Sequence, residues 1–258
     1  MEAEGMLHIK NFYFNALHEC CSVAWDDSGE CVVIDPGFYT PEERDELKRF
    51  IGEKGLKPVR ILLTHAHFDH VFGLKECAQM LGVPVCMDPA DRPTLENAGY
   101  FCTMFGFDTP DVDVPTEDIR DGDVIRFGKT ELEVIATPGH TPGGVCFFDR
   151  ADKILFSGDT LFAGSIGRTD HPGGDYDRLM ESILTRLMPL DGDVTVIPGH
   201  GPRTTIADES AKNPFLQPYN DPYEDDPDAE GIVPDTDSGL DGNAGLSGNI
   251  GEGEEREA

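Results

Sequence analysis

The chain has 258 residues, of which 38% are hydrophobic and 27% charged, a composition typical of a soluble globular protein with a sizeable core. Its formal net charge is −30, so nucleic acid and anionic membrane surfaces are repelled, and we expect neither as a partner. The first ten residues lack the apolar run of a signal peptide, and no later stretch approaches the roughly 20 apolar residues that cross a bilayer. We therefore expect a cytoplasmic protein.

Seven cysteines are scattered along the chain without a C-x-x-C pair or the regular spacing of a disulfide framework. Reduced thiols, buried as small apolar side chains, are the simpler interpretation, and they suit a cytoplasm.

The apolar pattern alternates short β-rich runs with helical periodicity, which indicates a mixed α/β fold. In chain order we expect a strand at 31–34, a helix at 42–54, a strand at 59–63, a helix at 71–81, strands at 83–87, 124–127, 131–135, 144–148 and 153–156, a helix at 176–187, a strand at 194–197 and a short helix near 207–212. Residues 1–217 would form one catalytic domain.

The composition changes near residue 218 to Asp, Glu, Gly, Pro, Asn and Ser, which indicates a disordered acidic tail over 218–258. Residues 220–258 hold 13 acidic residues and one basic residue, so they carry −12 and the rest of the chain −18. The body is therefore acidic in its own right.

The most informative segment, 64–70, reads Thr-His-Ala-His-Phe-Asp-His and lies between the expected strand at 59–63 and the expected helix at 71–81. Four potential metal ligands, His65, His67, Asp69 and His70, fall within six residues. A turn between a strand and a helix lets side chains two apart converge while the next pair is directed to a neighbouring point. Imidazole and carboxylate suit zinc, and also iron or manganese, so the ligand types leave the metal open.

Three more expected strands end in a possible ligand: His140 in Thr-Pro-Gly-His, Asp159 in Ser-Gly-Asp-Thr and His200 in Pro-Gly-His. A loop at a strand end is held by a rigid sheet, which allows precise placement of a side chain. Each residue alone would pass as a turn residue, but together with the histidine loop they form a set.

These motifs resemble the metallo-β-lactamase superfamily, and within it the glyoxalase II-like (hydroxyacylglutathione hydrolase-like) hydrolases, over roughly residues 7–215. The resemblance implies an α/β fold, an αββα sandwich, with the site along one edge. It implies two divalent metal ions, zinc in the first place. The first would be held by His65, His67 and His140 and the second by Asp69, His70 and His200, with Asp159 bridging both.

The resemblance also implies a mechanism in which a hydroxide that bridges the metals attacks the carbonyl of a thioester such as a hydroxyacylglutathione. Asp69 would be catalytic, orienting this nucleophile and accepting its proton. β-Lactamases of the family are exported and carry a cysteine or another residue where this chain has Asp159, which argues against antibiotic hydrolysis.

Two further residues have two interpretations each. Asp35 ends a strand at a turn, where it would support the metal-binding histidines from behind or serve as a plain turn residue. Arg168, in a Gly-rich segment after Asp159, would bind a substrate carboxylate or form a structural ion pair. His171, in the same segment, is expected to be a surface loop residue rather than a third-metal ligand.

Full-length glyoxalase II enzymes add a C-terminal helical domain with basic groups for glutathione, whereas this chain has only the acidic tail there. We therefore expect a short form that acts on a small-molecule substrate. Two alternatives are a mononuclear-iron persulfide dioxygenase, which has a similar fold and histidine loop, and a non-catalytic scaffold that metals stabilise. The sequence does not indicate the oligomeric state.

Overall fold

The computed structural model describes residues 6–217, apart from the side chain of Met104. The acidic tail expected at 218–258 lies outside these residues. None of the helices within 6–217 is long and apolar enough to cross a membrane.

Two six-stranded sheets form the centre of the structure described by residues 6–217. The first has the order β1 (His8–Phe14), β2 (Glu19–Trp25), β3 (Glu30–Ile34), β4 (Lys57–Leu62), β5 (Val85–Met87), β6 (Thr116–Asp118). Its first three strands are antiparallel and β3 to β6 are parallel. The second has the order β14 (Thr204–Thr205), β13 (Thr195–Pro198), β10 (Ile154–Gly158), β9 (Val145–Asp149), β8 (Thr130–Ala136), β7 (Val124–Phe127), and only β10 and β13 in it pair in parallel.

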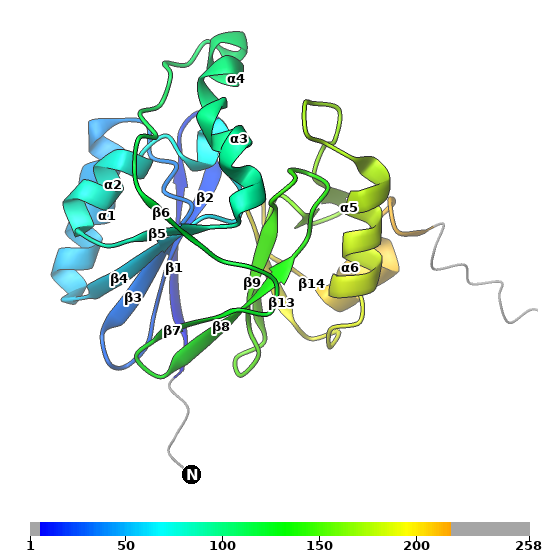
Figure 1. Cartoon of the computed structure of the whole chain (residues 1–258). Helices are drawn as coiled ribbons and strands as arrows, with labels where there is room; N and C mark the ends of the chain where they lie inside the picture. The colour runs from blue at the N-terminus through cyan, green and yellow to red at the C-terminus, as the bar shows by residue number, and fades with distance from the viewer. Residues whose placement is uncertain (1–5, 218–258) are drawn as a thin grey trace, which may run out of the picture. The chain divides into compact units, whose positions relative to one another are not determined.

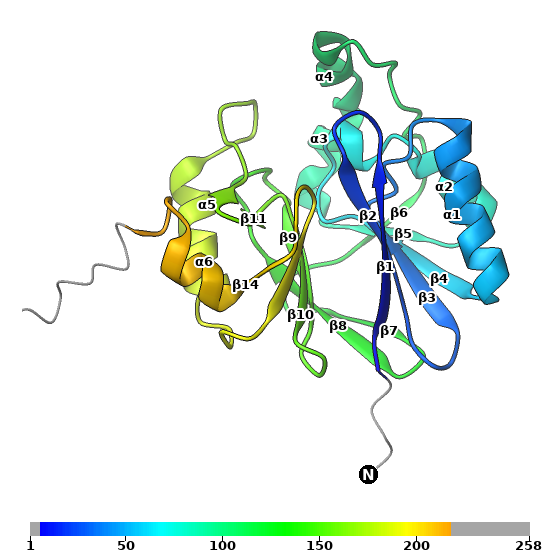
Figure 2. The ribbon, with the colours of Figure 1, turned by 180° about the vertical axis from the view of Figure 1, so that it is seen from behind.

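Helices cover the outer face of each sheet, as Figures 1 and 2 show. Helices α1 (Pro41–Lys54) and α2 (Leu74–Leu81) lie on the first sheet, and α5 (Tyr176–Ser182) and α6 (Ile206–Lys212) lie on the second. Helices α3 (Arg92–Glu96) and α4 (Ala98–Phe105) follow β5, and the small hairpin of β11 (Leu161–Phe162) and β12 (Ser165–Ile166) follows β10. This αββα sandwich confirms the fold class predicted from the sequence.

Three apolar clusters hold the layers together. Between the sheets, fully buried side chains such as Ile34, Phe127 and Phe156 pack against one another. Leu47 attaches α1 to the first sheet, and Leu179 attaches α5 to the second. Burial of this apolar surface is the main force that fixes the sheets, and thus the loops at their ends.

The start of α1 shows how local sequence sets an element. The Thr40 hydroxyl accepts a hydrogen bond from the Glu43 amide, and the Glu43 carboxylate accepts one from the Thr40 amide, which is a capping box. Pro41 supplies the first helical residue, and Gly55 ends the helix in the left-handed conformation at φ 64°.

All eight expected strands and all four expected helices are present, with shifted ends. The expected helix at 71–81 begins at Leu74, because a 3₁₀ turn at Phe68–His70 continues the histidine loop. The expected helix at 176–187 is α5 followed by a π-helical turn at Ile183–Leu187. Sequence analysis did not identify the strands β1, β2, β6, β11, β12 and β14 or the helices α3 and α4.

Candidate metal centre

The loops that follow β4, β8, β10 and β13 bring the predicted ligands together. His65, His67, Asp69 and His70 come from the first loop and its 3₁₀ turn. His140, Asp159 and His200 each come from one of the others. Hydrogen bonds join the loops of β10 and β13, since the Gly199 amide donates to the Gly158 carbonyl at 2.8 Å.

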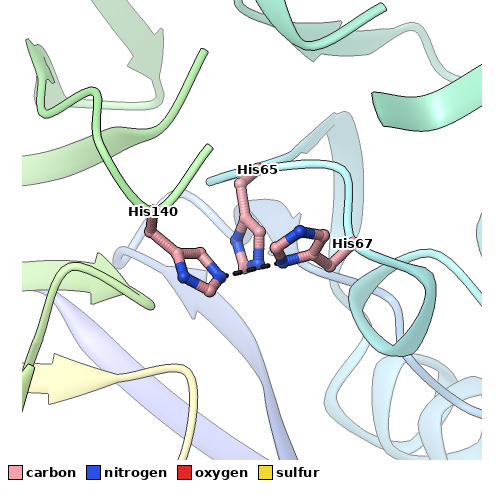
Figure 3. A group of neighbouring side chains, drawn as sticks. All are labelled: His65, His67 and His140. Carbon is pink, nitrogen blue, oxygen red and sulfur yellow. Dashed lines mark hydrogen bonds between the residues drawn. The ribbon is translucent and has the colours of Figure 1, made fainter. Parts of the chain in front are cut away.

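His65, His67 and His140 form a first group whose ring nitrogens lie within 4.8 Å of one another. Figure 3 shows the three rings turned toward one another from two separate loops. The Nδ1 atom of His67 lies 2.8 Å from Nε2 of His140, and both rings pack edge-on against His65.

Asp69, His70 and His200 form a second group, again within 4.8 Å. The Nε2 atom of His200 lies 3.1 Å from Oδ2 of Asp69 and 3.3 Å from Nε2 of His70. The structure thus brings each predicted set of three residues together.

Asp159 faces both groups with its two carboxylate oxygens. Its Oδ2 lies 3.5 Å from Nε2 of His140 in the first group and 3.7 Å from Nε2 of His200 in the second. Its Oδ1 lies 3.4 Å from Nε2 of His70. A side chain in this position can offer one oxygen to each of two cations.

The far side of four imidazole rings is bound to other parts of the chain. Nδ1 of His140 donates to the Arg168 carbonyl at 2.7 Å, and Nδ1 of His200 donates to the Leu17 carbonyl at 3.1 Å. Nδ1 of His70 lies 3.1 Å from a carboxylate oxygen of Asp35, and Nδ1 of His65 lies 3.1 Å from the Thr64 hydroxyl. Such contacts leave Nε2 free to bind a metal, and they are typical of metal-binding histidines.

Two buried atoms at the centre have no hydrogen-bond partner among the described residues: Nε2 of His65 and Oδ1 of Asp159. A buried polar atom without a partner destabilises the fold. Because both atoms can donate an electron pair, they indicate a bound cation. Five imidazoles and two carboxylates around one point suit divalent cations such as zinc, iron or manganese. The residues present therefore fit a pair of metal ions.

Burial favours the neutral, metal-binding form of the first group of histidines. It lowers the pKa of His65, His67 and His140, which keeps these rings neutral with a free electron pair.

The carboxylates have the opposite effect on the second group. Burial alone would lower the pKa of His70 and of His200, but contacts with Asp159 and Asp69 raise both pKa values, so these rings favour the protonated form unless a cation takes the place of the proton. Burial alone would raise the pKa of Asp159, but His70 and its other imidazole neighbours hold that pKa well below its ordinary value. The Asp159 carboxylate is therefore ionised.

Asp35 supports the histidine loop from behind. Its carboxylate accepts hydrogen bonds from the Thr64 amide at 2.7 Å and the Thr64 hydroxyl at 2.6 Å, in addition to its contact with His70. Its backbone has a φ of 50°, in the left-handed region that aspartate tolerates better than most residues. These contacts match the supporting role expected from the sequence rather than that of a plain turn residue.

Sequence analysis missed Asp91, which joins two of the ligand loops. Its carboxylate accepts hydrogen bonds from the Ala66 amide at 2.8 Å, the Thr141 hydroxyl at 2.9 Å and the Gly143 amide at 2.8 Å. Asp91 follows a Pro-Ala dipeptide at a helix start, so only the three-dimensional structure reveals these partners.

Glu19 was also missed. It is completely buried, both of its carboxylate oxygens lack a hydrogen-bond partner among the described residues, and burial raises its pKa well above the ordinary value. One oxygen lies 4.0 Å from Nδ1 of His70. The carboxyl occupies space left by Gly37, where a Cβ atom would lie 2.2 Å from Oε2 of Glu19.

Arg168 and His171 lie at the rim of a pocket that opens onto the metal-binding residues. Arg168 forms hydrogen bonds to both carboxylate oxygens of Asp170, at 2.8 and 3.0 Å, so the ion pair proposed from the sequence is present. The ring centre of His171 lies 4.7 Å from that of His67 and 5.1 Å from that of His140. His171, which the sequence indicated to be a surface loop residue, thus lies beside the first group of histidines.

Comparisons with known proteins agree with this geometry. A sequence profile of the metallo-β-lactamase superfamily matches residues 20–200. The chain is 37% identical over 212 residues to the hydroxyacylglutathione hydrolase GloC of Haemophilus influenzae, and the match spans 81% of this chain and 98% of that protein.

Two solved structures are similar over the same region. The di-iron-bound form of TTHA1623 is 39% identical with a TM-score of 0.73, covering 80% of this chain and 100% of that chain. The B3 metallo-β-lactamase BLEG-1 is 33% identical with a TM-score of 0.75, covering 81% of this chain and 100% of that chain. The fold, the converging histidines and these matches together show that the chain belongs to the metallo-β-lactamase superfamily.

Proposed function

We propose that this protein is a metal-dependent thioester hydrolase, with a hydroxyacylglutathione as the first thioester to assay. The observation that carries the proposal is the pair of three-residue groups with the two oxygens of Asp159 between them. An arrangement that faces two cations and opens into a pocket differs from the closed four-ligand cage of a structural zinc site. It therefore favours an enzyme over a metal-stabilised scaffold.

His65, His67 and His140 would hold one cation, Asp69, His70 and His200 the other, and Asp159 both. When bound, two divalent cations, zinc in the first place, would supply Lewis acidity and hydroxide at neutral pH. The chain's own residues would place the reaction, because a substrate held by the pocket wall would have its carbonyl carbon next to the metal-binding groups.

Asp69 lines this pocket and is the acidic residue of the histidine loop. From that position it would orient the attacking water and accept its proton, which is the work of a general base. The Asp69 side chain is 9% exposed and its Oδ2 lies 3.1 Å from Nε2 of His200, so its orientation is fixed.

The match to GloC, a hydroxyacylglutathione hydrolase that spans nearly the same residues, supports the thioester. A small-molecule substrate also fits the acidic chain better than nucleic acid or an anionic membrane would. We further propose a cytoplasmic location, which the seven free, buried thiols of the structure support.

The test compares hydrolysis of S-lactoylglutathione by the metal-loaded protein with that by two variants. Asp69→Asn should lower kcat by about 100-fold or more, because the loss of a general base typically costs 10²- to 10⁴-fold. Asp27→Asn is the matched control: this exposed aspartate pairs with His8 and does not line the pocket, so the change should leave kcat unchanged. Both variants should unfold at about the same temperature as the parent protein.

Two other substrates separate the alternatives. Nitrocefin tests β-lactam hydrolysis, which the 33% identity to a B3 metallo-β-lactamase makes the second reaction to examine. Glutathione persulfide, with oxygen consumption as the readout, tests the iron dioxygenase. Faster turnover of either compound than of any thioester would contradict the proposed function.

A further inference from the structure

We propose that this protein prefers a thioester with an apolar acyl group, such as one with an aromatic ring, on an uncharged thiol rather than on glutathione. This inference rests on the proposed function and narrows its substrate class. It comes from the walls of the pocket rather than from the metal-binding residues.

The pocket has a volume of about 560 Å³ and reaches His67, Asp69, Asp159 and His200. Pockets that bind small molecules have about this size. A ligand that fills it would therefore have its reactive bond at the metal-binding residues and the rest of its surface against the wall.

Most of that wall is aromatic or aliphatic. Helix α4 contributes Tyr100, Phe101 and Phe105, and Phe105 stacks on Phe68 of the histidine loop with ring centres 5.5 Å apart. Leu17, Phe162 and Ile166 add aliphatic and aromatic surface from the β1–β2 turn and the β11–β12 hairpin.

Part of this surface is open to solvent. Tyr100 is 65% exposed and Phe105 is 50% exposed. Exposed aromatic side chains gathered at a pocket are a common mark of a binding site, because a ligand buries them. An apolar group on the substrate would do so here.

The charges of the pocket wall do not favour an anionic group. Among the described residues that line the pocket, Arg168 is the single side chain with a permanent positive charge, and both oxygens of Asp170 bind that guanidinium. Two divalent cations would offset the carboxylates of Asp69 and Asp159 at the floor, so the comparison concerns the wall alone. Glutathione carries two carboxylates and one ammonium group, and its carboxylates would meet no unpaired permanent cation along this wall.

A matched set of four thioesters tests the inference: the acetyl and phenylacetyl esters of N-acetylcysteamine, which is uncharged, and of glutathione. With the metal-loaded protein we expect kcat/KM to be about 10- to 100-fold higher for phenylacetyl than for acetyl, as burial of a phenyl ring predicts. For each acyl group, we expect the N-acetylcysteamine ester to have the higher kcat/KM at low ionic strength.

Variants of the pocket wall test whether its aromatic side chains cause the preference for the phenylacetyl group. Tyr100→Ala and Phe105→Ala remove exposed rings, and each should reduce the phenylacetyl-to-acetyl ratio of kcat/KM by about 3- to 10-fold. Tyr176→Ala removes a ring of α5 that is 45% exposed and outside the pocket, and it should leave the ratio unchanged.

A binding measurement separates the pocket from catalysis. The thioether S-(2-phenylethyl)-N-acetylcysteamine cannot be hydrolysed, and calorimetry should show that it binds the metal-free protein more tightly than S-(2-phenylethyl)glutathione does. Tighter binding of the glutathione compound, or higher kcat/KM for glutathione esters, would overturn this inference and leave the proposed function intact. Cleavage of none of the four thioesters would contradict the proposed function, and the calorimetry would then decide the ligand preference of the pocket alone.

Discussion

The Nε2 atoms of His70 and His200 lie 3.3 Å apart although 130 positions separate the two residues in the chain. The residue before His200 makes this approach possible. A Cβ atom on Gly199 would lie 2.3 Å from Oδ1 of Asp159 and 2.7 Å from Cε1 of His70, distances at which atoms overlap. Only glycine lets this backbone pass so close to the metal-binding side chains.

Gly199→Ala should therefore disrupt the second group of ligands. We expect the variant to retain less metal than the parent protein and to lose most thioester hydrolysis, because the β13 loop must move away from Asp159. Gly52→Ala is the control: this glycine lies in α1 with nothing within 4 Å of an added Cβ, and alanine there should stabilise the protein by about 0.5–1 kcal/mol. A Gly199→Ala protein with full metal content by elemental analysis would contradict the account.

Asp91→Asn should destabilise the protein by about 2–3 kcal/mol, the cost of leaving buried donors without an acceptor. The Asp91 carboxylate accepts three hydrogen bonds from the two ligand loops. In asparagine, the side-chain NH₂ group would face one of these N–H or O–H groups and could not accept its hydrogen bond. Denaturant unfolding measures the effect. In Asp88→Asn the new side chain can still accept the hydrogen bond from the Ala90 amide that caps the next turn, so that variant should lose under 1 kcal/mol. Equal losses in the two variants would sink this role for Asp91.

The candidate metal-binding residues could be identified in the sequence because their signal is local. His65, His67, Asp69 and His70 lie within one short segment, and His140, Asp159 and His200 each follow an apolar run at a Gly-containing turn. Most of the eight strands found are short apolar runs, such as β9 and β10, and β7 and β8 show the alternation of a strand that is buried on one face.

The surroundings of the site could not be predicted in the same way. Asp91 binds residues 25 or more positions away, and Glu19 lies beside His70, which is 51 positions further along the chain, so no local pattern reveals either contact. Helix α4 is apolar on most sides and short, so its sequence has no helical periodicity to detect. Both the pocket wall and the contacts that fix the ligand loops therefore required the structure.

Asp170→Asn should shift the substrate preference toward anions. The variant frees the Arg168 guanidinium, which could then bind a substrate carboxylate. We expect kcat/KM for glutathione esters to rise by about 2- to 10-fold relative to the matched N-acetylcysteamine esters. The gain should shrink as salt is added, because Arg168 is exposed and salt screens its attraction for the substrate carboxylate. A ratio that does not change at low salt would show that this ion pair does not determine the selectivity.

The thiols should be unreactive in the folded protein. All seven cysteines are free and buried, and burial raises the pKa of Cys20 and of Cys31 to about 12, so little thiolate exists at pH 8. Titration with Ellman's reagent should detect fewer than one thiol per chain under native conditions and all seven in denaturant. Rapid reaction of several native thiols would contradict the burial described.

The central claim is that seven side chains hold two cations and that these cations are needed to cleave a thioester. The most direct measurement purifies the protein without added metal, determines zinc, iron and manganese per chain, and assays thioester hydrolysis on the same sample before and after removal of the metal with a chelator. The account predicts two metal ions per chain, with hydrolysis that is lost on chelation and regained in proportion to the metal restored. One iron per chain, with oxygen consumption on glutathione persulfide and no thioester cleavage, would contradict it.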